Sequence, residues 1–184
     1  REFHLDEDRA AIEAWLSERF GRPVRLEVAA GGGLTDGVIY GETDQTGPTL
    51  VSAATLREVA SWYDGIDARE MRLRLRVNLV VEGVPPFWED RLVAGGGRAF
   101  QIGDVRLEGT HPVPRCVVPT RDPHTGEVTD GFRETFLERR EATLPEWADR
   151  GAFDGNLYSV TVGTHVPESE RDGELRVGDT VQVV

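Results

Sequence analysis

Cys116, the only cysteine of the chain, lies in a proline-rich stretch over residues 111–126. It follows Arg115 and precedes two valines. Prolines at 112, 114 and 119 fix φ and keep their predecessors out of the helical region, so we expect a stiff strand or strand edge. A thiol beside a guanidinium is a candidate ligand for a soft metal, or a nucleophile, because the positive charge favours the thiolate. A lone cysteine is also commonly a small buried hydrophobe, so its neighbours alone leave both interpretations open.

The thiol segment is followed by Asp122-Pro123-His124-Thr125-Gly126, which is typical of a tight turn. Asp122 and His124 could relay protons, but their setting favours an interpretation as turn residues. The four histidines of the chain are scattered, without the spacing of metal ligands.

The composition excludes several kinds of partner and cofactor. The chain carries 33 acidic and 21 basic residues, and its net charge of −12 argues against nucleic acid and anionic membranes as partners. Every basic residue is an arginine, so neither a lysine Schiff base to pyridoxal phosphate nor a P-loop lysine is possible in this chain. No signal peptide or membrane-spanning run is visible and one cysteine cannot form an internal disulfide, so we expect a cytoplasmic protein.

The elements that must position the thiol follow from the spacing of apolar residues. The pattern predicts helices over 6–20, 53–62, 68–73 and 132–141, and strands over 24–28, 49–52, 74–81 and 156–162. Gly-Asp steps at 103–104 and 178–179 interrupt two alternating runs and predict tight turns or bulges between antiparallel strands. Many short strands with few helices predict a mainly β (α+β) fold, a closed and mostly antiparallel barrel with peripheral helices.

Two pairs of polar residues are candidates for holding an anion. Ser52 and Thr55 begin the helix predicted over 53–62, where an N-terminus attracts anions, although simple capping explains them as well. Arg76 and Asn78 are two apart on a predicted strand and would project from one face. A guanidinium beside an amide can grip a phosphate or a heterocycle edge, and an ordinary surface pair is the alternative.

The order of these motifs resembles the MOSC domain, the C-terminal domain type of molybdenum cofactor sulfurases. Within that superfamily the chain is most similar to the branch of the mitochondrial amidoxime-reducing component. The motifs that carry the resemblance lie at 48–52, 74–80, 87–90, 102–105, 115–117 with 122–126, and 177–179. The resemblance implies that 49–184 is a MOSC domain with a pyruvate kinase β-barrel-like fold. It also implies that 1–28 is the tail of an N-terminal MOSC β-barrel-type domain and that 29–48 is a flexible linker.

The resemblance further implies a binding site for the molybdenum cofactor, Mo-molybdopterin. Cys116 matches the cysteine that ligates Mo, although Val113 stands where relatives often carry a second cysteine. The positions matching cofactor contacts are Ser52, Thr55, Arg76, Asn78, Tyr158 and, through its backbone carbonyl alone, Pro114.

The implied activity is that of a Mo-dependent oxidoreductase which reduces small N-oxygenated compounds. Cys116 would hold Mo and Arg115 would keep the thiolate ionised. Electrons would come from a separate electron-donor redox protein, because a single cysteine cannot hold an iron–sulfur cluster and no flavin or haem motif is present. One alternative is a sulfur carrier or transferase that passes a Cys116 persulfide sulfur to an acceptor. Another is a non-catalytic module that binds the cofactor and hands it on.

Overall fold

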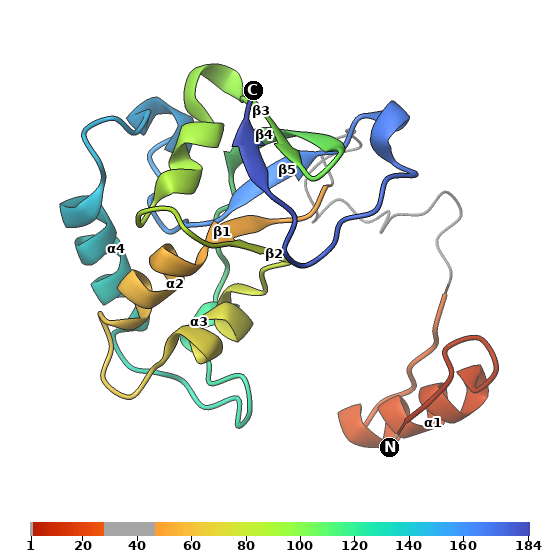
Figure 1. Cartoon of the computed structure of the whole chain (residues 1–184). Coiled ribbons are helices and arrows are strands. Elements are labelled where there is room, and N and C mark those ends of the chain that lie inside the picture. The colour runs from red at the N-terminus through yellow and green to blue at the C-terminus, as the bar shows by residue number, and fades with distance from the viewer. Residues whose placement is uncertain (1, 28–46) are drawn as a thin grey trace. The chain divides into compact units, whose positions relative to one another are not determined.

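The computed structural model describes residues 2–27 and 47–184, and the predicted linker over 29–48 lies almost entirely outside the described residues (Figure 1). The chain divides into two compact units, Arg1–Gly41 and Glu42–Val184.

The N-terminal unit contains one helix, α1 (Arg9–Phe20), within its described part. It ends as predicted at Gly21, whose φ of 63° allows the left-handed turn that stops a helix. The strand predicted over 24–28 is wrong for the described residues 24–27. The N–H groups of Val24 and Leu26 bind side chains of α1 at 2.8 Å instead, so they are not available for a strand ladder.

The larger unit is built on a six-stranded mixed sheet that forms a nearly closed barrel. Its spatial order is β2-β1-β5-β4-β3-β6; β1 and β2 are parallel, and the other pairs are antiparallel. This arrangement confirms the predicted barrel. The strands are β1 (Leu50–Ser52), β2 (Leu79–Val81), β3 (Ala99–Ile102), β4 (Val105–Pro112), β5 (Val162–His165) and β6 (Val181–Val183).

Three helices, α2 (Ala53–Ala60), α3 (Ala68–Leu75) and α4 (Phe132–Thr143), lie together on one side of the sheet (Figure 1). Strand β1 separates two apolar cores because successive side chains point to opposite faces. Val51 packs with the helices, whereas Leu50 packs with Phe100 and Leu107 of the barrel strands. Short 3-10 turns complete the unit: η1 (Trp88–Leu92), η2 (Ala94–Gly96), η3 (Val118–Thr120), η4 (Arg150–Phe153) and η5 (Glu168–Glu170).

The strand predicted over 74–81 is wrong in its first half. Helix α3 continues to Leu75, and Arg76 closes it in the left-handed conformation at φ 50°. Arg74 extends the helix because its guanidinium is buried and its Nε donates to Glu70 one turn earlier, at 2.8 Å. Arg76 and Asn78 therefore do not alternate along one strand.

The strand predicted over 156–162 begins only at its last residue, Val162. Its neighbour in the fold is the proline-rich segment, in which Pro112 and Pro114 have no N–H to donate. The backbone N–H groups of Val113 and Arg115 bridge the two segments, to the Thr161 oxygen at 2.8 Å and to the Tyr158 oxygen at 2.9 Å. The two acceptors are three residues apart, whereas a regular antiparallel ladder needs them two apart, so the register is broken and no continuous strand forms here.

The two Gly-Asp steps lie against each other in the barrel. The first forms the turn between β3 and β4, where Gly103 has a φ of 57°. Its N–H donates to the Thr180 oxygen at 3.0 Å, and a side chain at Gly103 would come within 2.9 Å of the Asp179 carboxylate. The second step leads into β6, so the turns predicted from the two motifs are present.

Candidate functional site

The thiol of Cys116 is exposed, at the end of the proline-rich segment and immediately before η3. Val117 beside it is 64% exposed, so the chain turns outward at this point. The alternative of a small buried hydrophobe is excluded, and the sulfur is accessible to a ligand or a substrate.

Tyr158 lies next to the thiol. Its ring is buried and packs edge-on against Phe136 at 4.9 Å, and its hydroxyl has no hydrogen-bond partner among the residues that the structure describes. Burial raises the pKa of Tyr158 to about 12; the guanidiniums of Arg133 and Arg115 oppose this, whereas Cys116 adds to it. The name thiol site is used below for Tyr158 and the three residues that interact with it: Cys116, Arg115 and Arg133.

Arg115 fixes the geometry of the thiol site through backbone and side chain together. Its N–H donates to the Tyr158 oxygen at 2.9 Å, and its Nη2 donates to the hydroxyl of buried Thr161. Both bonds reach the segment that leads into β5. The residue before the cysteine therefore anchors the thiol segment to the sheet, and Pro114 lies between two anchored neighbours.

Arg133 was missed by the sequence analysis. It is exposed in the first turn of α4, and its guanidinium carbon lies 5.5 Å from the centre of the Tyr158 ring. No motif marks it, because a surface arginine on a helix is ordinary and only the fold brings it to the Tyr158 ring.

Ser52 and Thr55 are fully buried at the start of α2. The Ser52 side chain caps the helix by accepting from the Thr55 N–H at 3.0 Å, and it donates to the Thr55 hydroxyl at 2.8 Å. That hydroxyl also accepts from the Phe87 N–H at 2.6 Å. Both hydroxyls are thus engaged inside the protein, and the capping interpretation describes their role in this structure.

Glu89 reaches the same helix terminus and was also missed. Its Oε1 accepts from the Ser52 N–H at 3.1 Å, whereas its Oε2 has no hydrogen-bond partner among the described residues. Burial raises the pKa of Glu89 to about 7. The neighbouring Asp90 is paired with buried Arg140 at 2.5 Å. Residues 87–90 were noted only as a motif of the family resemblance, because burial of the two acids depends on the fold and is not visible in the local sequence.

Arg76 and Asn78 lie apart from both the thiol site and the start of α2. Arg76 is exposed, and the Asn78 carbonyl oxygen accepts from the N–H and the hydroxyl of Thr49, each at 3.0 Å. Thr49 precedes β1 and Ser52 ends it, so the two polar pairs are about 10 Å apart along the strand at ~3.3 Å per residue. The structure therefore unites Cys116, Arg115 and Tyr158, but it does not bring the Ser52 and Asn78 pairs into contact.

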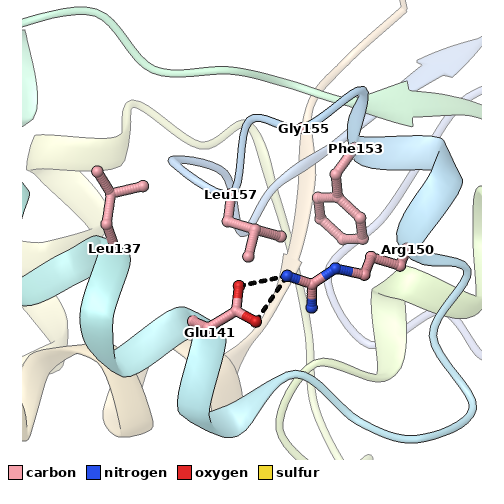
Figure 2. Close-up of a pocket in the computed structure, with 6 residues that line it drawn as sticks. All are labelled: Leu137, Glu141, Arg150, Phe153, Gly155 and Leu157. Carbon is pink, nitrogen blue, oxygen red and sulfur yellow. Dashed lines mark hydrogen bonds and ion pairs between the residues drawn. The ribbon is translucent and has the colours of Figure 1, made fainter.

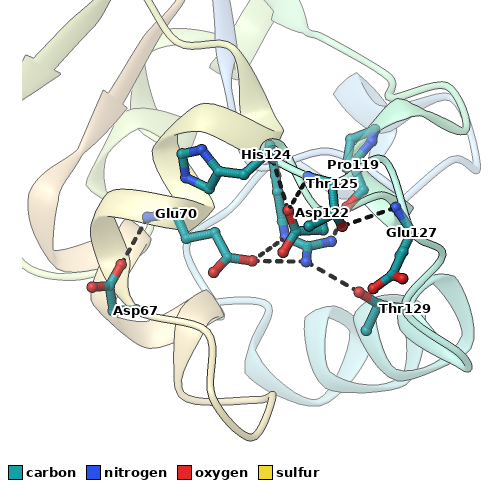
Figure 3. Close-up of polar contacts among 9 residues, drawn as sticks. Asp67, Glu70, Pro119, Asp122, His124, Thr125, Glu127 and Thr129 are labelled. Atoms are coloured by element: carbon teal, nitrogen blue, oxygen red, sulfur yellow. Dashed lines mark hydrogen bonds and ion pairs between the residues drawn. The ribbon is translucent and has the colours of Figure 1, made fainter.

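Asp122 and His124 form a turn, as predicted (Figure 3). The Asp122 carboxylate accepts from the N–H groups of His124 at 2.7 Å and Thr125 at 2.8 Å. These bonds hold the pKa of Asp122 below its usual value, which makes the group a poor proton donor near neutral pH.

A hollow of about 210 Å³ lies between α4 and the segment that contains η4 (Figure 2). Across it, Arg150 Nη2 donates to both oxygens of Glu141 at 2.6 Å. Its other lining residues are Leu137, Phe153, Gly155 and Leu157. None of the candidate residues lines this hollow. Its two charged lining residues, Arg150 and Glu141, bind each other, so we assign the hollow no function.

Within residues 2–27 and 47–184, no group of three or more His, Cys, Asp and Glu side chains is arranged to hold a metal ion. Within the same ranges, no helix has the length and apolar character needed to cross a membrane.

Comparison with known proteins places the chain in a family. Residues 47–182 match the MOSC domain. The chain belongs to the MOSC domain family. A segment of 67 residues is 36% identical to a protein of Caenorhabditis elegans named molybdenum cofactor sulfurase. That segment is 36% of this chain and 9% of the relative, so the chain spans only a small part of the curated relative that it matches.

Proposed function

We propose that this MOSC domain binds the molybdenum cofactor, Mo-molybdopterin, at the thiol site, with Cys116 as the metal ligand. The observation that carries the proposal is the exposed thiol on a segment that Arg115 anchors to the backbone of Tyr158, whose buried ring lies under the guanidinium of Arg133. A thiolate is a soft donor suited to a soft metal, and the cofactor's phosphate is an anion that arginines bind well. The name of the C. elegans relative supports a link to this cofactor.

The residues of the thiol site fit such a group. The Tyr158 hydroxyl has no partner in the described chain, and a buried hydroxyl left unbonded costs free energy. A bound polar ligand at Cys116 would give it one. Arg115 and Arg133 would offset the ligand's negative charge, and Tyr158 would form an apolar wall. Arg76 and Asn78 stay proposed contacts to the phosphate; Ser52 and Thr55 could serve directly only by exchanging their present internal bonds.

The proposed activity is the reduction of N-oxygenated compounds, as in the branch that the motifs resemble. When bound, the cofactor would supply a metal that exchanges oxygen and electrons with the substrate. The chain would contribute the thiolate that holds the metal and the guanidiniums that balance charge around it. A separate redox protein would supply electrons, since the one cysteine is committed to the metal.

A sulfur carrier is the second candidate, favoured by the exposure of the thiol and by the sulfurase name of the relative. The Cys116 thiolate would attack the outer sulfur of a donor persulfide, and the donor thiolate would leave. The resulting persulfide would then pass its outer sulfur to an acceptor.

Cofactor content separates the two candidates. We expect protein from a host that makes the cofactor to contain Mo and pterin, and Cys116→Ser to lower both about tenfold or more. Val117→Ser, a change at the exposed residue next to it, is the control and should retain both. A mass increase of ~32 Da on the thiol, without Mo, would instead support the sulfur carrier. Full Mo content and full reductase activity in Cys116→Ser would refute Cys116 as the ligand.

A further inference from the structure

One face of α3 presents arginines around a leucine. Arg69, Arg72 and Leu73 are spaced at i, i+3 and i+4 and are all exposed, Leu73 by 46%; Arg76, also exposed, is the residue that closes the helix. The opposite face, with Met71, Arg74 and Leu75, is buried. These four exposed residues are called the α3 basic face.

The positive charge of this face is not neutralised within the described residues. The single carboxylate on α3, Glu70, pairs with Arg74 at 2.7 Å, and no described acidic side chain pairs with Arg69, Arg72 or Arg76. The chain as a whole has a net charge of −12, so a local group of three exposed arginines contrasts with the rest of the molecule. Such contrast is a means of orienting an oppositely charged partner.

The helix that carries the α3 basic face is a neighbour of η3, the turn that follows the thiol. Helix α3 packs against η3, and Arg74 fastens the two by donating to the Pro119 oxygen at 3.0 Å and to the Thr129 hydroxyl at 3.1 Å (Figure 3). Val117 and Val118, directly after Cys116, are 64% and 42% exposed. Exposed apolar side chains beside arginines are the composition typical of a protein interface.

We propose that the α3 basic face and these two valines dock the acidic surface of a small electron-transfer protein, which delivers its electrons at the thiol site. The destination of the electrons rests on the proposed function, whereas the docking does not. The neighbourhood of the thiol argues for a redox partner, and the overall negative charge of the chain argues against nucleic acid.

Binding to a plant-type ferredoxin, a small acidic redox protein, tests the docking. Affinity is measured for the cofactor-loaded chain at low and moderate KCl. We expect Arg69→Glu/Arg72→Glu to weaken binding about tenfold or more at low salt, and added salt to weaken wild-type binding. The control, Arg98→Glu/Arg139→Glu, makes the same change in charge at exposed arginines outside α3 and should bind like the wild type.

Turnover of an N-hydroxylated amidine separates failure of the docking from failure of the function. Reduced methyl viologen, a small cationic donor, needs no docking surface and should drive both double variants at the wild-type rate. Reduced ferredoxin should show a raised KM only with Arg69→Glu/Arg72→Glu.

Absence of viologen-driven turnover would refute the proposed function. The binding measurement would still decide whether the α3 basic face docks the partner. Ferredoxin binding that is absent, or equal in wild type and the α3 variant, would overturn the docking face, as would stronger binding of a short DNA duplex there.

Discussion

Glu89 is a carboxyl group enclosed by the core, with one oxygen bonded to the start of α2 and the other unbonded among the described residues. Burial raises its pKa from 4.5 to about 7 in the folded chain. Between those values the folded state holds a proton that the unfolded state has lost, so the free energy of unfolding falls as pH rises. The loss amounts to about 3 kcal/mol and is complete above pH 7.

Glu89→Gln should remove this pH dependence, because the amide keeps an acceptor for the Ser52 N–H without ionising. We expect the variant to gain stability over the wild type from pH 4.5 to 7 and to stay more stable at pH 8. Urea unfolding at several pH values measures the difference. Exposed Glu138→Gln is the control. Curves for Glu89→Gln and wild type that run parallel would show that Glu89 titrates normally.

The sequence singles out residues whose chemistry is rare in the chain, and their proposed roles stay predictions. Cys116 is the only cysteine, and its neighbour Arg115 follows from the sequence alone. Tyr158 entered only through the family resemblance, since nothing in its own segment marks it. Arg133 and Glu89 could not be found, because the features that make them notable are a tertiary contact and complete burial.

At the scale of elements, Arg74 joins α3 to the segment that follows the thiol. Its guanidinium contacts Glu70, the Pro119 oxygen and the Thr129 hydroxyl, and it lies 5.3 Å from the Phe132 ring centre. Arg74→Ala would leave a nearly buried carbonyl and a half-buried carboxylate without their partner.

We expect Arg74→Ala to lower the free energy of unfolding by about 3 kcal/mol, as for other buried and bonded charges. Urea denaturation measures this loss, and proteolysis in the turn after η3 should become faster. Arg72→Ala removes an exposed arginine from the same helix and should change stability by less than about 0.5 kcal/mol. Equal stability of the two variants would mean that α3 and η3 are held together without Arg74.

The same arginine explains why the strand predicted over 74–81 is wrong in its first half. Alternating arginine and apolar residues fit a strand with one polar face, but Arg74 is buried and bonded, so the alternation does not reflect exposure. Over 156–162, β-forming residues are present, but the backbone bonds to the opposing segment skip a residue and break the register. Helices with a cap and an apolar face, such as the one beginning at Ser52, were predicted well because their signals are local. Strand limits depend on a partner strand that the local sequence does not contain.

At the scale of the molecule, the sheet separates two cores and carries the thiol segment at the end of β4. The bond pattern of Arg115 ties that segment to the approach of β5, and Arg74 ties the next segment to α3. The thiol is therefore exposed on a backbone that is fixed on both sides. This arrangement suits a metal ligand, whose position must not change between bound states.

The net charge of the whole chain leads to the last prediction. With 33 acidic and 21 basic residues, carboxylates must exceed their possible partners, and their repulsion opposes the compact state. Salt screens that repulsion, because the Debye length falls from ~30 Å at 0.01 M to ~3 Å at 1 M. Salt also weakens exposed pairs such as Arg150–Glu141, but these contribute little, and the buried Arg140–Asp90 pair is largely shielded from it.

We therefore expect Tm to rise by about 3 °C between low and molar KCl at neutral pH, which corresponds to about 1 kcal/mol for a domain of this size. Thermal unfolding followed by circular dichroism measures it, with KCl chosen because sulfate would also strengthen apolar burial. Glu138→Gln/Asp172→Asn, which removes two exposed negative charges, should raise Tm at low salt and shrink the response to KCl. If Tm is unchanged or falls as KCl is added, charge repulsion does not limit the stability of this fold, and the acidic composition must be explained in another way.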